Sequence, residues 1–313
     1  MGYCDAPVRH TWQVVRVLGA VQHSIEEGRL TPMVPRKRNG APNSDPSGGL
    51  GPGSALARAV ALHLEGKPKD ALRELNAAVE RGEDSPEIHS ARGFLQFELE
   101  LFEEAAKSYQ RLLEVQPQHP TAPFNLAVCL EKLGRWDEAA LHFRKTLSGN
   151  PEKEDARLGL GVCLLHQQQP EVALGEFDKY LARKPNDETA MFGKAVALQL
   201  LQRYAEATEA YERIIERNPN SEDSLANLVT IGISTKNDEQ VRRYAERLLT
   251  LRPFSQTALE GLATCAFAAG ESLKIAADQR FARLRVARGA HNQIHVQTAN
   301  DYNAFLHHNL RVE

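Results

Sequence analysis

The sequence has few aromatic residues, few cysteines and no long apolar stretch. Phe, Trp and Tyr make up 6% of the 313 residues, whereas Ala, Leu and Glu are frequent, and this mixture favours helices over β-sheets. No uninterrupted apolar run approaches the roughly 20 residues of a bilayer-spanning helix, so we expect no membrane span. Four cysteines are too few for a disulfide scaffold and fit a reducing compartment. We therefore expect a cytoplasmic protein.

The sequence also lacks a basic excess. Its net charge is −3 at pH 7, which argues against a nucleic-acid partner because phosphate contacts need clustered Lys and Arg. The charge is unevenly distributed: residues 1–50 and residues 271–313 each hold six Lys/Arg against four acids, which leaves −7 for the region between them. This asymmetry suggests that the basic ends can fold back onto an acidic middle.

The sequence repeats itself with a period of 34 residues, which appears in independent columns. A proline column reads Pro117, Pro151, Pro185, Pro219 and Pro253. An alanine column reads Ala71, Ala105, Ala139, Ala173 and Ala207, and Val241 continues it. A column of small residues reads Ala59, Gly93, Ala127, Gly161, Ala195, Val229 and Ala263, and a column of mostly large ones reads Leu75, Tyr109, Phe143, Phe177 and Tyr211.

Each period predicts two helices joined by short turns. In the period from 120 to 151, Leu126 and Leu130 have helical spacing, and Gly134 suits the end of a helix. Asp137 and its neighbour place acids in the first turn of a second helix, where they complement its dipole. Pro151 stops that helix, because proline cannot donate a backbone hydrogen bond.

The four columns at these separations resemble the tetratricopeptide repeat. The resemblance covers about residues 54–270, or near seven repeats. It implies an all-α, right-handed superhelix, an α-solenoid, whose first helices line a concave groove. It also implies a non-catalytic module that binds a protein or peptide partner.

The sequence outside the repeats divides into three further segments. Residues 1–30 include a possible amphipathic helix over 8–29. Residues 31–53 are rich in Pro and Gly and are typical of a flexible linker. Residues 271–313 are expected to form a capping helix and a polar tail.

The resemblance assigns three outward positions of each first helix to the groove. Through the middle of the array these positions are unusually apolar, and an apolar patch of this kind favours binding of a partner's peptide or amphipathic helix. An alternative is that these side chains pack against neighbouring first helices. The predicted groove residues are Phe94, Phe97, Phe124, Asn125, Val128, Leu158, Val162, Leu165, Phe192 and Val196.

Two kinds of groove known in the family do not fit the sequence. Only Asn125 matches the set of residues that clamps a C-terminal carboxylate. The asparagine ladder that holds an extended peptide is broken by Gly159, Gly193 and Gly261. These glycines could leave depressions for a partner's side chains, and close helix packing explains them equally well.

No motif for catalysis, a cofactor or a metal is present. The flanking segments are too short for a usual catalytic domain, and no phosphate loop, nucleophile elbow or zinc-protease motif occurs. Cys129, Cys163 and Cys265 share one repeat column and are expected to be buried structural thiols. We therefore expect no enzyme activity.

Three other possibilities remain open from the sequence. Residues 8–29 could dock in the groove of their own chain. The N-terminal segment could belong to a regulator linked to nucleic acid, because residues 24–30 weakly resemble part of a bacterial winged-helix regulator. The array could also be a structural assembly scaffold.

Overall fold

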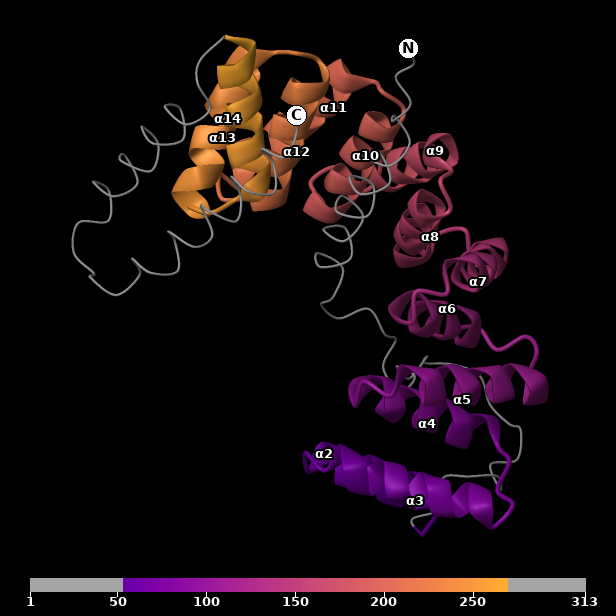
Figure 1. Cartoon of the computed structure of the whole chain (residues 1–313). Coiled ribbons are helices and arrows are strands. Elements are labelled where there is room, and N and C mark those ends of the chain that lie inside the picture. The colour runs from indigo at the N-terminus through magenta and orange to yellow at the C-terminus, as the bar shows by residue number, and fades with distance from the viewer. Residues whose placement is uncertain (1–52, 270–313) are drawn as a thin grey trace, which may run out of the picture. The chain divides into compact units, whose positions relative to one another are not determined.

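The computed structural model describes residues 53–269, and all thirteen regular elements in this range are α-helices (Figure 1). The first helices of the repeats are α2 (Ala55–Leu64), α4 (Pro86–Glu98), α6 (Ala122–Lys132), α8 (Glu154–His166), α10 (Glu188–Leu200), α12 (Glu222–Ser234) and α14 (Gln256–Ala268). The second helices are α3 (Pro68–Glu80), α5 (Phe102–Val115), α7 (Trp136–Gly149), α9 (Pro170–Leu181), α11 (Tyr204–Arg217) and α13 (Asp238–Leu251).

Each first helix packs against the second helix of its own repeat, from α2 with α3 to α12 with α13. The predicted helix–turn–helix repeat and the all-α solenoid class are therefore confirmed for the described residues. The N-terminal segment and the linker lie outside the described residues, as does the C-terminal segment from residue 270, and their predicted helices remain predictions.

The chain divides into two compact units between Pro219 and Asn220. The first unit contains α2 to α11, and the second contains α12 to α14. In the first unit, α2 contacts α4, and α8 contacts both α6 and α10. In the described part of this unit, the second helices do not pack against one another in this way. The first helices therefore form the inner layer of this stack.

The layers are joined by aromatic rings packed against small residues. The rings of Tyr109, Phe143, Phe177 and Tyr211 are all 0% exposed. A Cβ atom built on Gly161 would lie 2.8 Å from Phe177 Cε1, and one built on Gly193 would lie 2.5 Å from Phe177 Cζ. The Phe177 ring therefore lies against α8 of its own repeat and α10 of the next. Close packing, rather than a depression for a ligand, explains these glycines.

A left-handed residue ends the first helices at a fixed repeat position. Gly66 and Gly134 have φ values of 75° and 70°, and both are followed by the hydrogen bonds of a Schellman turn. In later repeats Gln168 and Gln202 stand at this position with φ of 59° each. Side chains with a Cβ atom are strained in this conformation, so these turns are not optimised for stability.

The ring packing predicts opposite effects for two glycines. Gly193→Ala should destabilise the fold by about 1–3 kcal/mol, because the buried Phe177 ring already lies against Gly161 of α8 and cannot move away from α10. Gly175→Ala is the matched control, because nothing lies within 4 Å of its Cβ position in α9; it should stabilise by about 0.5–1 kcal/mol. Urea unfolding followed by circular dichroism measures both, and equal effects would contradict the packing.

The positive φ angle at the end of the first helices predicts that a glycine introduced there increases stability. Gln168→Gly should raise the free energy of unfolding by about 0.5–1 kcal/mol, because glycine adopts positive φ without a steric cost. The reciprocal change, Gly134→Gln, should lower it by a similar amount. The same unfolding measurement checks both variants, and a loss of stability in Gln168→Gly would show that another contact holds this turn.

Candidate functional site

The predicted groove residues lie on four first helices of one unit, α4, α6, α8 and α10. We call these ten residues the groove row. Their exposure differs along the row. Phe94 and Phe97 on α4 are half-buried. The other eight are at most 5% exposed: Phe124 1%, Asn125 3%, Val128 3%, Leu158 4%, Val162 0%, Leu165 0%, Phe192 5% and Val196 0%. Over α6, α8 and α10 the row is therefore not an exposed apolar surface in the structure, and its role in binding a partner stays a prediction.

Aromatic packing within the repeats accounts for part of this burial. The Phe124 and Phe143 ring centroids are 6.0 Å apart, and those of Phe192 and Tyr211 are 5.6 Å apart. In both pairs the ring of a first helix lies on a ring of the second helix of the same repeat. Lys153 Nζ also lies 4.5 Å from the Phe124 ring centroid.

The sequence contained a signal for this burial. In α6, every residue from Ala122 to Glu131 is buried, and α8 is buried around most of its circumference. A helix that is apolar on all sides is typical of an interior helix rather than of one with a free face. The repeat resemblance assigns positions to the groove and takes no account of this pattern.

Among the described side chains of the first helices, the one large apolar side chain that is exposed lies at the N-terminal end of the array. Leu64, the last residue of α2, is 81% exposed. The preceding His63 packs edge-on against Phe94, with a centroid distance of 5.6 Å. Phe97, one helical turn further along α4, packs edge-on against Phe102 at 5.2 Å. We call His63, Leu64, Phe94 and Phe97 the end patch.

Sequence reasoning missed His63 and Leu64. They stand 34 residues before Phe97 and Glu98 and so occupy the corresponding places of the first repeat. The period alone could have found them. His63 Nε2 lies 2.7 Å from Glu98 Oε2, and this carboxylate is 43% exposed. Glu65 beside Leu64 is also exposed, and Lys67 Nζ lies 3.0 Å from Glu65 Oε2, so the rim of the end patch carries charges of both signs.

A cavity of about 330 Å³ lies where the turn before α7 meets the end of α8. The rings of Trp136 and His166 stack at its wall, 3.6 Å apart and 3° from parallel. Gln167 Nε2 donates to Asp137 Oδ1 over 2.9 Å. Burial lowers the pKa of His166 to about 4, so the imidazole is neutral at pH 7. Its Nε2 atom is buried without a hydrogen-bond partner.

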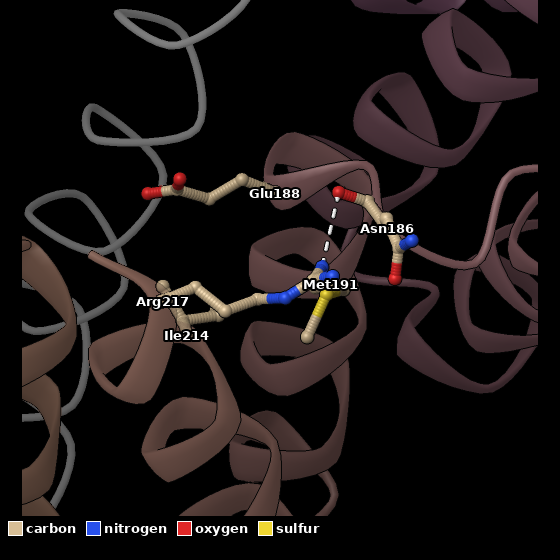
Figure 2. Close-up of a pocket in the computed structure, with 5 residues that line it drawn as sticks. All are labelled: Asn186, Glu188, Met191, Ile214 and Arg217. Atoms are coloured by element: carbon tan, nitrogen blue, oxygen red, sulfur yellow. Dashed lines mark hydrogen bonds between the residues drawn. The ribbon is translucent and has the colours of Figure 1, made fainter.

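A second cavity, of about 220 Å³, lies between α10 and α11 (Figure 2). Arg217 Nη1 donates to the carbonyl oxygen of Asn186 over 3.4 Å at this site. Glu188 and Met191 complete much of its wall, and Figure 2 shows the Glu188 carboxylate directed away from the arginine. Neither cavity brings together a nucleophile and a base.

The thiols are placed as the sequence predicts. Cys129, Cys163 and Cys265 form no disulfide bond, and they are at most 1% exposed. Burial raises the pKa of Cys129, so this thiol stays protonated and unreactive. Within residues 53–269, no group of three or more His, Cys, Asp or Glu side chains is arranged to hold a metal ion. No helix in this range is both long and apolar enough to cross a bilayer.

Family models agree with the repeat architecture. Two models described as tetratricopeptide repeat match residues 90–154 and 135–198. A third, described as the coatomer epsilon subunit, matches residues 177–258. No curated protein sequence is significantly similar to this chain.

Solved structures show the same fold at low sequence identity. YrrB, described as a tetratricopeptide repeat protein with an unusual peptide-binding site, is 22% identical over 59% of this chain and 96% of YrrB, with a TM-score of 0.52. A tetratricopeptide repeat protein from Parabacteroides merdae is 19% identical over 76% of this chain and 93% of its own, with a TM-score of 0.56. PilF from Pseudomonas aeruginosa is 19% identical over 66% of this chain and 94% of PilF, with a TM-score of 0.52.

Stacked helical hairpins with a 34-residue period define an α-helical repeat solenoid. The matched models identify the particular kind over part of the chain: residues 90–198 contain tetratricopeptide repeats.

The His166 environment predicts a loss of stability in acid. An unfolded histidine has a pKa near 6.5, and the folded value is about 4, so between these values the unfolded chain binds more protons. The neutral ring therefore contributes stability that is present above pH 6.5 and is lost as the pH falls toward 4.

His166→Phe keeps an aromatic ring on Trp136 and removes this titration. Because the ring is only partly buried, we expect the stability lost between pH 7 and pH 5 to be smaller in the variant by about 1 kcal/mol. Urea unfolding at the two pH values measures the difference. An unchanged loss would show that the pKa of His166 is not lowered.

Proposed function

We propose that this chain is a non-catalytic protein-interaction module whose end patch binds the apolar face of a partner's amphipathic helix or peptide. The observation that carries the proposal is the 81% exposure of Leu64, which directly follows His63, the residue that packs on the half-buried Phe94. An exposed group of large apolar side chains with a polar rim is typical of a docking site. The fold class supports the proposal of a protein-interaction module, because tetratricopeptide repeats are typically interaction modules.

The geometry suits a short helical ligand. His63 and Leu64 come from α2, and Phe94 and Phe97 lie one turn apart on α4, so a helix can lay side chains at i, i+3 and i+4 across both. The charged rim of Glu65, Lys67 and Glu98 favours a partner with charged residues beside its apolar face. The peptide-binding site named for YrrB supports this class of ligand by analogy of fold.

We also propose a cytoplasmic location. Cys129, Cys163 and Cys265, in the described residues, form no disulfide bond. Thiols outside disulfides fit a reducing compartment, where disulfides are rare.

Leu64→Asp tests the end patch with little effect on the fold, because this side chain is exposed. A displayed library of helical peptides is selected on the parent chain, and the affinity of a selected peptide for each variant is measured by fluorescence anisotropy. We expect Leu64→Asp to weaken binding at least about tenfold, since burial of a leucine contributes roughly 1.5–3 kcal/mol.

Leu141→Asp is the matched control, because Leu141 is 62% exposed on the second helix α7. It should leave the affinity unchanged. Failure to select any peptide, or equal affinities for parent and Leu64→Asp, would contradict binding at the end patch.

A further inference from the structure

The buried part of the groove row is more enclosed than its position in the repeat explains. Phe94, Val128, Val162 and Val196 stand at one position of successive repeats. Phe94 is half-buried, whereas the three valines are 3%, 0% and 0% exposed. Thr230, at the same position of α12, is also half-buried. The enclosure of the three valines is therefore not a property of the repeat position and points to an additional contact over α6, α8 and α10.

The enclosed side chains lie on one side of α8. Leu158, Val162 and Leu165 are spaced by four and three residues and therefore share a face. Cys163 and Leu164 on another side are buried as well. Among the described helices, α8 contacts α6 and α10 in its own layer and α7 and α9 in the second-helix layer. These contacts lie within the two layers, and no third layer of described helices packs on α8.

We propose that residues 8–29 of this chain cover the groove row over α6, α8 and α10. These residues lie outside the described part of the chain, and their sequence predicts an amphipathic helix. The apolar positions that would contact the row are Val14, Val17, Leu18, Val21 and Ile25. Aliphatic side chains of this size match the valines and leucines of the row, and each one buried contributes to the contact.

The tether has the length that this contact requires. About 24 residues separate Arg29 from Ser54, which is the N-cap of α2, and a flexible chain of that length spans roughly 25–30 Å. Packed helices lie about 8–10 Å apart, so α6 and α8 are two and three helix spacings from α2. A short tether also raises the effective concentration of the segment to the millimolar range.

Charge favours the same arrangement. Residues 1–50 carry two net positive charges, whereas the array between the ends carries seven net negative ones. The polar face of the segment includes Arg9 and Arg16, and an acidic array attracts them. The part of the groove row on α6, α8 and α10 shares no residue with the end patch, so this inference goes beyond the proposed function and does not depend on partner binding.

The test uses the full chain with Val162→Cys, a change of nearly equal volume. The rate of maleimide labelling at position 162 is followed by fragment-ion mass spectrometry, which distinguishes it from the adjacent Cys163, relative to the rate at buried Cys129. Three chains are compared: this parent, the parent with Leu18→Asp and Val21→Asp, and the parent with Ala20→Asp and His23→Asp. The last pair adds the same charge on the opposite face of the predicted helix.

We expect slow labelling at position 162 in the parent and in the Ala20→Asp/His23→Asp chain. The Leu18→Asp/Val21→Asp chain should label at least tenfold faster at this position, with the rate at Cys129 unchanged. Fast labelling in the parent would overturn the proposal. Equal ratios of the two rates in all three chains would also overturn it, because the row would then be closed by the array alone or by another occupant.

Discussion

Contact between an aromatic ring on a second helix and the small residues of two first helices is the constraint on which the fold depends. Phe177 illustrates it, with its ring against Gly161 in its own repeat and Gly193 in the next. Because the ring is fully buried, the distance between these helices is fixed by its thickness and by the absence of a Cβ atom. The 34-residue period in the sequence thus reflects one packing contact that is repeated along the chain.

This contact also decides which surface is available for function. Tight stacking brings first helices close to one another, and Phe124 and Phe192 pack inward on rings of their own repeats. At the N-terminal end of the described array, α2 has no preceding described repeat. Leu64 is exposed there, and Phe94 keeps part of its ring accessible. The accessible apolar surface of the inner layer is therefore local rather than continuous.

The repeat architecture could be predicted from the sequence because it depends on local signals. The proline and glycine columns mark turns, and the period places the helices between them. The burial of Val162 and Leu165 could not be predicted in the same way, because it depends on what lies against them rather than on their place in the repeat. Leu64 was missed for a related reason: the first repeat lacks the proline that marks the others. The left-handed Gln168 shows that a turn can be kept where its preferred glycine is absent.

The central claim is that the apolar inner layer is closed along α6, α8 and α10 and open at the end patch. Hydroxyl-radical footprinting of the full chain measures this most directly, because leucine and phenylalanine side chains are oxidised according to their exposure. The structure predicts ready oxidation of Leu64, intermediate oxidation of Phe94, and protection of Phe124, Leu165 and Phe192. Similar oxidation of all five side chains would contradict the account.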